Sequence, residues 1–335
     1  MCEIDVETLE VQKKLNEAKD RINPRTFYKV ANRYDFSDVL KWYLIDNGVL
    51  DIKPTNGYLK MNEMLGLYVG GVVRELRTFH IAEFPGEFIK ATIAYCRRKN
   101  ISLDWHGQSL MPSVDSTALK EDEYLFGKFR DRWLMSKEMD GNLMNPEVLK
   151  WYKKYFSDEK RKVDLATADG GMDVSGNYNE QERAHFKLFA GEIHVALSAL
   201  KVGGTFILKI YQIVYPLTAT YCILLSAIFD SVEILKPETS RFRNDEKYLI
   251  CRGLKGSIGD IHNFFMKIVR GVKEYDCFIP NFDVSENMEI IRKYEIEFMK
   301  NEAKNINFLM DISEKKIKTP FDNGLDIEEY VKKFY

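Results

Sequence analysis

Two ionisable residues in the middle of the sequence stand where a buried strand would end. The mostly apolar run 163–168 leads into Asp169 and two glycines, and a second apolar run, 205–210, carries Lys209 near its end. Between them, residues 179–200 begin with a helix-start signal and continue as an apolar helix. A strand, a helix and a strand in this order form a right-handed parallel unit, so Asp169 and Lys209 should meet at the edge where open α/β sheets bind ligands. A carboxylate and an ammonium group at that edge could bind a ligand or move a proton.

Lys60 and Glu246 are two further ionisable residues in such settings. Residues 57–67 carry apolar side chains at helical spacing with Lys60 among them, although a lysine on a helix is ordinarily a solvated tip. Glu246 ends a charged loop, 236–246, and falls at the edge of the strand that follows. A solvated hairpin is one interpretation of this loop, but it also contains three residues of the types that contact phosphate and ribose: Ser240, Arg241 and Arg243.

A glycine turn at 83–88, with the sequence EFPGEF, separates a predicted strand, 77–82, from a predicted helix, 89–99. Nucleotide-like cofactors meet backbone N–H groups and a helix amino terminus at such turns, although an ordinary turn is the simpler interpretation. The next predicted strand, 101–105, bears Asp104 at its end. An acid there can accept two hydrogen bonds from a ribose diol, and a surface acid is the alternative.

The remaining segments complete an α/β pattern with helical ends. Residues 231–235 and 247–252 are further predicted strands, and the Asp-Gly-Asn sequence at 140–142 is interpreted as a loop over the base of a cofactor. Both ends of the chain show amphipathic helical spacing. The predicted parts are a helical extension at 1–50, an α/β core at 51–258 and a second helical extension at 259–335.

Composition excludes several classes of protein. The 335 residues, 45% of them hydrophobic, suffice for one substantial core with peripheral additions. The formal net charge of -2 shows no overall basicity, so any nucleic-acid binding must use a local patch. Five widely spaced cysteines without a CxxC pair indicate reduced thiols, and neither a disulfide framework nor a zinc site. No segment resembles a signal peptide or a membrane span, so we expect a soluble, intracellular protein that does not enter membranes.

The four ionisable residues occur in the order Lys60, Asp169, Lys209 and Glu246, and the sequence around them resembles the FtsJ-like (RrmJ-type) 2′-O-ribose methyltransferases. Within that family it resembles the cap-specific mRNA branch of eukaryotes and large DNA viruses. Five phrases in the family's order carry the resemblance and span about residues 57–255: YLKM, EFPGEFI, TADGGMDVSGNYNEQE, GGTFILK and KPETSRFRNDEKYLICRG.

The resemblance implies a fold, a cofactor and a reaction. The fold would be α/β, with a Rossmann-like, seven-stranded, mostly parallel sheet flanked by helices. The cofactor would be S-adenosyl-L-methionine, whose methyl group would move to a ribose 2′-hydroxyl near the 5′ end of capped mRNA. The catalytic residues would be Lys60, Asp169, Lys209 and Glu246, with no metal ion.

Lys209 would be the proton acceptor in this reaction. A ribose hydroxyl is a poor nucleophile at neutral pH, so the protein must help to remove its proton and hold the reacting atoms in line. A partly desolvated Lys209 beside another ammonium group is expected to have a lowered pKa, which suits it to this role. Lys60 and the two acids would orient Lys209 and balance its charge.

The family's cofactor and RNA contacts carry over to matching residues. The cofactor-binding residues would be Glu83, Pro85, Gly86, Phe88, Asp104, Asn142 and Asp169. The RNA-binding residues would be Ser240, Arg241 and Arg243. The chain departs from the family's usual pattern at Phe84 and Glu87, whose bulk would narrow the pocket. It also departs at Asn142, which lacks the charge of the usual Asp and predicts weaker cofactor binding.

Two alternatives stay open at this stage. One is the same chemistry on another RNA, because bacterial relatives modify ribosomal RNA. The other is a catalytically weak subunit of a capping complex that keeps the methyltransferase fold. The capping interpretations imply the capped 5′ end of mRNA as a partner, and other capping enzymes bound through the terminal helices. They place the protein in the nucleus or in the cytoplasm, including a viral factory or virion.

Overall fold

The computed structural model describes residues 4–69, 74–111, 123–135, 140–172, 174, 180–256, 260–271, 285–314 and 325–335. Within these residues, six strands form one sheet in the order β2-β1-β3-β4-β6-β5. Their bounds are Glu75–Ile81 (β1), Ser102–Gly107 (β2), Val163–Ala168 (β3), Leu200–Ile210 (β4), Phe229–Leu235 (β5) and Lys247–Leu254 (β6). Strands β2, β1, β3 and β4 pair in parallel, whereas β6 runs antiparallel to both of its neighbours. The predicted α/β class with a mostly parallel sheet is confirmed.

The expected count of seven strands is wrong for the described part of the chain. Six apolar runs in the sequence predict strands, and each of them overlaps a strand of the structure. The family resemblance alone predicts a seventh strand. The wrong strand count therefore came from the family resemblance, whereas the apolar runs of this sequence indicate the six observed strands.

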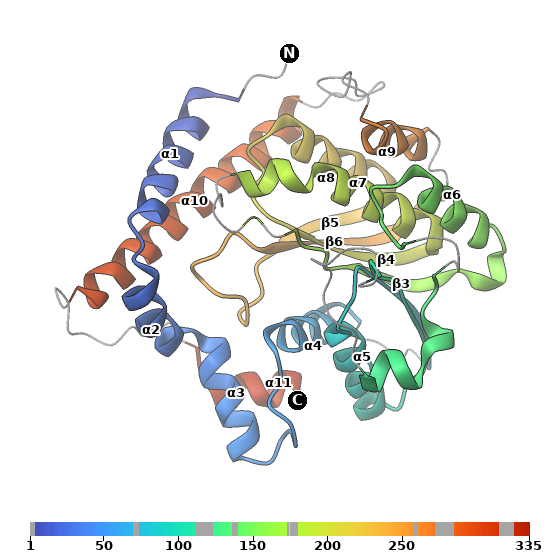
Figure 1. The fold of residues 1–335 in the computed structure, drawn as a ribbon, viewed down its shortest axis with the longest axis horizontal. Helices are drawn as coiled ribbons and strands as arrows, with labels where there is room; N and C mark the ends of the chain where they lie inside the picture. The colour runs from blue at the N-terminus through green and yellow to red at the C-terminus, as the bar shows by residue number, and fades with distance from the viewer. Residues whose placement is uncertain are drawn as a thin grey trace.

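Helices cover both faces of the sheet (Figure 1). On one face lie α6 (Pro146–Tyr155), α7 (Gln181–Ala199), α8 (Pro216–Ile228) and α9 (Ile261–Val269), and on the other lie α4 (Asn56–Tyr68), α5 (Glu87–Lys99) and α11 (Ile327–Phe334). Successive side chains of β4 alternate between the two layers, because Phe206 and Leu208 join one hydrophobic cluster and Ile207 joins the other. Burial on both faces explains the continuous apolar runs of these strands.

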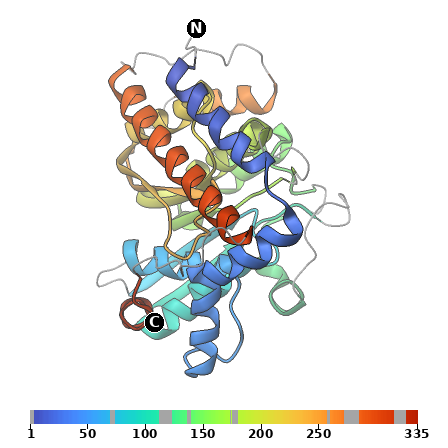
Figure 2. The ribbon, with the colours of Figure 1, turned by 90° about the vertical axis from the view of Figure 1, so that its left-hand side faces the viewer.

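The helical ends of the chain pack together beside the sheet. Helices α1 (Val6–Asp20) and α10 (Ser285–Ser313) lie side by side, and α2 (Pro24–Tyr34) leads from α1 to α3 (Phe36–Asp46) (Figure 2). The hydrophobic cluster between α1 and α10 also contacts Phe242, from the loop between β5 and β6. Both ends of the chain therefore pack against the loop that leads to Glu246.

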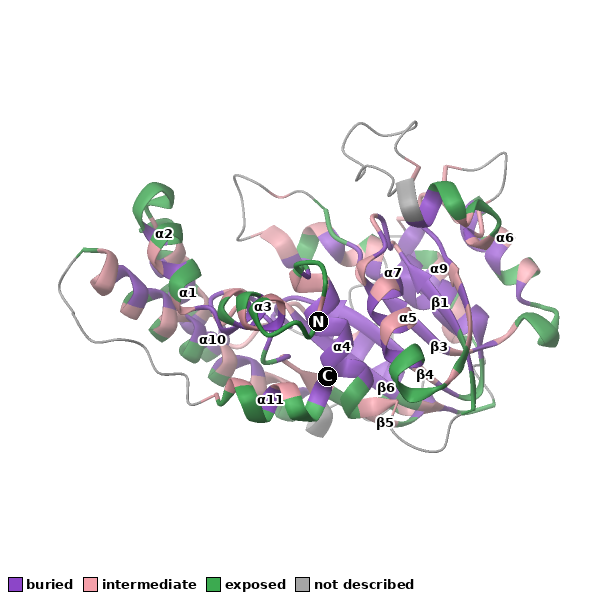
Figure 3. Ribbon diagram, turned by 90° about the horizontal axis from the view of Figure 1, so that it is seen from below, coloured by how far each residue is buried: buried purple, intermediate pink, exposed green. Residues whose placement is uncertain are grey.

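Burial is concentrated in the sheet and in the helix faces that touch it (Figure 3). The outer faces of α1 and α2 carry exposed side chains, as expected for helices with one face in water. Among the described helices, none combines the length and the apolar character needed to cross a membrane.

Candidate active site

Asp169 and Lys209 meet at the carboxyl edge of the sheet, as the sequence predicts. Strands β3 and β4 are parallel, and Ala168 lies opposite Leu208, so the two residues that follow stand at the same level. The Nζ atom of Lys209 donates a hydrogen bond to the backbone oxygen of Asp169 at 2.7 Å and lies 3.4 Å from its Oδ1 atom. The side chains are 9% and 22% exposed, so this ion pair is partly shielded from water.

Lys60 and Glu246 reach the same edge from two other elements. Helix α4 begins where the hydroxyl of Thr55 accepts the N–H of Tyr58, and it presents Lys60 toward the start of β6. The Nζ atom of Lys60 donates to the Oε1 atom of Glu246 at 2.5 Å. Burial raises the pKa of Glu246, but the positive charges of Lys60 and Lys209 hold it at about 2. Glu246 is therefore ionised at neutral pH.

Tyr248 joins the two pairs, and the sequence prediction missed it. Its hydroxyl lies 2.9 Å from the Oδ1 atom of Asp169 and 3.4 Å from the Oε1 atom of Glu246. Burial raises the pKa of Tyr248 well above its ordinary value, and both carboxylates add to the effect, so the hydroxyl keeps its proton. A usable signal was present, because Tyr248 follows Glu246 by two residues and such residues point to the same face of a strand. Lys60, Asp169, Lys209 and Glu246 thus form one hydrogen-bonded group through Tyr248.

The expected depression of the Lys209 pKa is contradicted by its surroundings. Burial lowers the pKa of Lys209, but the charge of Asp169 raises it, with further contributions from Tyr211, Glu246 and Glu192. The net shift is upward, so Lys209 is a protonated ammonium group at neutral pH. The prediction of a lowered pKa took into account one neighbouring ammonium group. In the fold, several carboxylates lie near Lys209 and raise its pKa.

Helix α7 fixes the chain that follows Asp169. The Oε1 atom of Glu192 accepts the N–H of Gly170 at 3.0 Å, and a side chain at Gly170 would collide with that carboxyl group. The Nε2 atom of His185 accepts the N–H of Met172 at 2.8 Å. Burial lowers the pKa of His185 to about 4, so its ring is neutral and can accept this bond. Helix α7 also carries Glu182 and His194 as buried polar residues, so the sequence alone does not single out Glu192 and His185 for this role.

Glu83 closes the amino terminus of α5 at the end of β1. Its Oε1 atom accepts the N–H groups of Phe88 at 2.7 Å and Ile89 at 3.2 Å. Gly86 precedes the helix with a φ of 105°, a conformation that favours glycine. Burial raises the pKa of Glu83 well above its ordinary value, and the negative charge of Asp169 raises it further. Glu83, Gly86 and Asp169 therefore share one edge, where the amides of Phe88 and Ile89 are already bonded to Glu83.

The bulky residues of this turn have structural partners. Phe84 is buried against Phe126 and Trp133, with ring centroids 5.0 and 4.6 Å away. The Oε2 atom of Glu87 accepts a hydrogen bond from the hydroxyl of Thr55 at 2.5 Å. These contacts account for both departures from the family's usual small residues.

Three other predicted cofactor residues surround the turn or lie in the loop before α6. Pro85 is half-buried, and Phe88 is buried against the ring of Tyr248 with centroids 6.2 Å apart. The Oδ1 atom of Asn142 accepts the N–H of Met144 at 2.9 Å, which fixes that loop. The contacts of Pro85, Phe88 and Asn142 with a cofactor stay predictions.

Asp104 is not brought to this edge. Strand β2 continues to Gly107, and the register pairs Asp104 with Arg77, four residues before Ile81 ends β1. Four residues correspond to about 13 Å along a strand. The Asp104 side chain is 47% exposed and accepts a hydrogen bond from Arg132 at 3.0 Å. The predicted strand ended too early, which misplaced its terminal acid.

Gln108 and Ser109 follow β2 and occupy the position predicted for Asp104. Gln108 accepts the N–H of Ala82 through Oε1 at 3.0 Å and donates through Nε2 to the backbone oxygen of Gly141 at 2.7 Å. The hydroxyl of Ser109 accepts the N–H of Phe84 at 3.2 Å. Gln108 thus ties the end of β1 to the loop that contains Asn142.

The three predicted RNA residues have different surroundings. Arg243 is buried, with its guanidinium against Asp35 and 2.9 Å from the Oδ1 atom of Asn32, so it holds α2 and α3 to the loop instead of facing RNA. Arg241 is 42% exposed, with its Nε atom 3.9 Å from Asp35. Ser240 is buried and donates to Glu246 at 3.4 Å. Only Arg241, of these three, is open to a large ligand.

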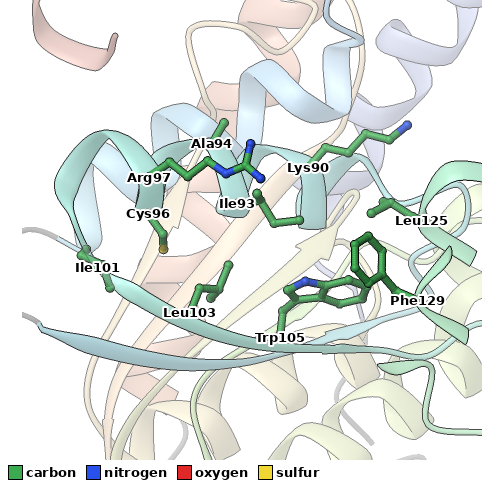
Figure 4. Close-up of a pocket in the computed structure, with 10 residues that line it drawn as sticks. All are labelled: Lys90, Ile93, Ala94, Cys96, Arg97, Ile101, Leu103, Trp105, Leu125 and Phe129. Atoms are coloured by element: carbon green, nitrogen blue, oxygen red, sulfur yellow. The ribbon is translucent and has the colours of Figure 1, made fainter. Parts of the chain in front are cut away.

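A cavity of about 430 Å³ lies apart from these residues, between α5 and β2 (Figure 4). Its lining is mostly apolar, with Trp105 and Phe129 on one side and the cations Lys90 and Arg97 on α5. None of the tetrad residues or predicted cofactor residues lines it.

Known proteins match this chain over the region that forms the site. A model of the FtsJ-like methyltransferase family matches residues 54–254. The chain is 28% identical over 252 residues to cap-specific mRNA (nucleoside-2′-O-)-methyltransferase 2 of Drosophila melanogaster, which covers 72% of this chain and 36% of that protein. It is 31% identical over 206 residues to the probable methyltransferase EP424R of African swine fever virus, which covers 58% of this chain and 48% of that protein.

A third relative extends over more of the chain. Cap-specific mRNA (nucleoside-2′-O-)-methyltransferase 1A of Caenorhabditis briggsae is 27% identical over 310 residues, which cover 86% of this chain and 34% of that protein. The chain therefore spans between a third and a half of the length of these three relatives.

Proposed function

We propose, from the premise that this chain belongs to the FtsJ-like methyltransferase family, that it transfers a methyl group from S-adenosylmethionine to a ribose 2′-hydroxyl near the 5′ cap of mRNA. The observation that carries the proposal is the convergence of Lys60, Asp169, Lys209 and Glu246 at one strand edge. The names of the fruit-fly and nematode relatives support a capped mRNA as the substrate.

The tetrad fits the proton chemistry of this reaction. Lys209 would accept the proton of the 2′-hydroxyl, and Lys60, Asp169 and Glu246 would hold its amino group in place. The carboxylates keep Lys209 protonated in the ligand-free protein, so it must lose that proton before it can act as a base. Positive charge close to a lysine lowers its pKa, which favours this loss when a cation binds at the same edge.

The residues at the ends of β1 and β3 fit a cationic cofactor. When bound, S-adenosylmethionine supplies a methyl group on a positively charged sulfur. Burial, and after it the negative charge of Asp169, raises the pKa of Glu83, so positive charge bound beside the two groups would favour their ionised forms. We assign cofactor binding to Glu83, Pro85, Gly86, Phe88, Asn142 and Asp169, with Gln108 and Ser109 in place of Asp104.

A vestigial, non-catalytic subunit is disfavoured by the cost of the tetrad. Two lysines and two acids are largely withdrawn from water here, and such ion pairs are often no more stabilising than apolar residues of similar size. A protein without this chemistry would gain little by keeping them. Methyl transfer to another RNA stays the second candidate, because the same tetrad would serve it.

The test measures methyl transfer from labelled S-adenosylmethionine to two transcripts of one sequence, capped and uncapped. We expect 2′-O-methylation of the capped transcript, and Lys209→Ala should reduce transfer by about 10²–10⁴-fold because a positioned proton acceptor is lost. Lys201→Ala, at an exposed lysine on the same strand, is the matched control and should be normal. Calorimetry should show that both variants still bind the cofactor.

Each contrary result points to a different error. Equal methylation of both transcripts would indicate another RNA substrate. Failure of the wild-type chain to bind S-adenosylmethionine would favour the catalytically weak subunit. Near-normal transfer by Lys209→Ala would remove that residue as the base.

A further inference from the structure

Helix α2 carries a line of cations on its exposed side. Arg25, Lys29 and Arg33 stand four residues apart along α2. Residues four apart lie on one face of a helix, so Arg25 to Arg33 span about 12 Å. All three are exposed, and α2 itself contains no acid. We call these three residues the α2 cation stripe.

The opposite side of α2 explains why the stripe faces water. Phe27 and Ala31 are buried in the cluster that α1, α2 and α10 share. Arg25, Lys29 and Arg33 lie across the helix from these two residues, and α2 is drawn largely exposed or half-exposed (Figure 3). No described carboxylate forms an ion pair with any member of the stripe. Its positive charge is therefore not neutralised within the described structure.

The stripe is joined to the proposed active site by the loop before β6. Arg243 of this loop binds Asn32 of α2 at 2.9 Å and lies 5.7 Å from the ring of Tyr28. Tyr28 is 41% exposed beside the stripe. The same loop contains the partly exposed Arg241 and, through Ser240, contacts the catalytic Glu246. This loop thus links Glu246 to α2, with Arg241 as its partly exposed cation and the exposed ring of Tyr28 beside the stripe.

We infer that the α2 cation stripe binds the phosphate backbone of the RNA whose 5′ end occupies the active site. The inference rests on the proposed function, and it assigns an RNA-binding surface to the amino-terminal helices. Proteins that bind single-stranded RNA combine a positively charged track with exposed aromatic side chains, and this surface has both. An overall charge of -2 makes such a local patch necessary.

RNA explains this surface better than an acidic protein partner does. The loop that links α2 to Glu246 carries the partly exposed cation Arg241, which suits an RNA chain leaving the active site. The stripe has a regular spacing of one helical turn and no apolar centre among its exposed residues, whereas protein interfaces are usually built around buried apolar anchors.

The test compares RNA length, salt and charge. Binding of a capped 20-nucleotide RNA is measured by fluorescence anisotropy over a range of salt, without cofactor, and methylation is measured on that RNA and on a capped trinucleotide. Lys29→Gln/Arg33→Gln should weaken binding of the long RNA and reduce the salt slope by about 1.4, the value for two lost phosphate contacts on a single strand. The variant should methylate the capped trinucleotide as the wild type does.

Lys13→Gln/Lys14→Gln is the matched control, because it removes two exposed cations from α1 and leaves the stripe intact. It should bind the long RNA with the wild-type salt slope. An unchanged slope in Lys29→Gln/Arg33→Gln, or an equal loss in the control, would overturn the inference. Wild-type binding of poly-glutamate but not of RNA would overturn it in favour of an acidic protein. Anisotropy does not require methyl transfer. The two measurements can therefore refute RNA binding by the stripe without refuting the proposed enzyme activity, or refute the activity without refuting the binding.

Discussion

Glu246, just before β6, and Lys247, its first residue, form two ion pairs that differ in their contact with water. Glu246 pairs with Lys60 at the strand edge, where the side chains are 16% and 8% exposed. Lys247 points to the other side and pairs with Glu295 of α10 at 3.1 Å, where both side chains are fully buried. The Lys247 ammonium also lies 4.0 Å from the ring of Phe298. The accessible pair can meet a ligand, whereas the enclosed pair can only hold α10 against the strand.

The enclosed pair and its neighbours also fix the position of Glu246. Asp245 pairs with Lys19 of α1 at 2.6 Å, so the residues on both sides of Glu246 are tied to the terminal helices. The backbone oxygen of Glu246 accepts a hydrogen bond from Lys236 at 2.8 Å. The comparison teaches that the terminal helices support the site from behind, through residues that no substrate touches.

The largest effect should follow loss of charge on the accessible side. Glu246→Gln should lower the rate of methyl transfer by about 10²–10⁴-fold, because Lys60 and Lys209 lose a carboxylate that orients them. The amide oxygen can still accept the hydrogen bond of Lys60, so the midpoint of thermal unfolding should change little. Single-turnover methylation and thermal melts check the two parts. Normal turnover with a much lower melting point would assign Glu246 to stability alone.

Loss of charge on the enclosed side should act on stability. Glu295→Ala leaves the Lys247 ammonium buried without its carboxylate, and the free energy of unfolding should fall by about 3–5 kcal/mol. Urea unfolding measures this change. Glu289→Ala, at an exposed acid of the same helix, is the control and should unfold as the wild type does. A loss of methyl transfer without a loss of stability would contradict the comparison.

The pH profile should separate the two carboxylates. Because nearby carboxylates raise the pKa of Lys209, its neutral amine becomes more abundant as pH rises, and single-turnover methyl transfer should rise with pH through the neutral and alkaline range. Glu246→Gln removes one of these charges, so the rise should move to lower pH by roughly one unit. Glu295→Gln should leave the profile in place. Equal shifts in both variants would show that the enclosed pair is also coupled to Lys209.

The smallest effect should come from removing the enclosed pair entirely. Lys247→Met/Glu295→Leu replaces both charges by apolar groups, so the free energy of unfolding should stay within about 1 kcal/mol of the wild type or increase. Urea unfolding beside Glu295→Ala checks this. If the double variant is as unstable as Glu295→Ala, the loss of the ion pair itself, and not an unpaired buried Lys247, explains the instability.

The positions of site residues at the ends of strands could be predicted from the sequence. Asp169 and Lys209 end apolar runs, and parallel pairing brings them together without further information. Asp104 failed on the same principle, because β2 extends through Trp105 and His106 and leaves Asp104 in mid-strand. A boundary error of two residues is enough to move an acid away from a sheet edge.

Burial and electrostatics in the loop before β6 were less predictable. Its composition indicates arginines but does not show that Arg243 turns inward to Asp35 while Arg241 stays exposed. The upward shift of the Lys209 pKa depends on how many carboxylates the fold brings near, and Glu192 on α7 has no motif that announces it. Such properties arise from contacts between distant segments.

The hydrogen bonds of Glu83 have a consequence for small ions. A free helix amino terminus attracts phosphate and sulfate, but the amides of Phe88 and Ile89 in the first turn of α5 already donate to the side chain of Glu83. Two of the donors that an inorganic anion would use there are therefore taken, and Asp169 nearby repels anions. Phosphate buffer should therefore be a poor competitor at this edge, which is open to positively charged molecules instead.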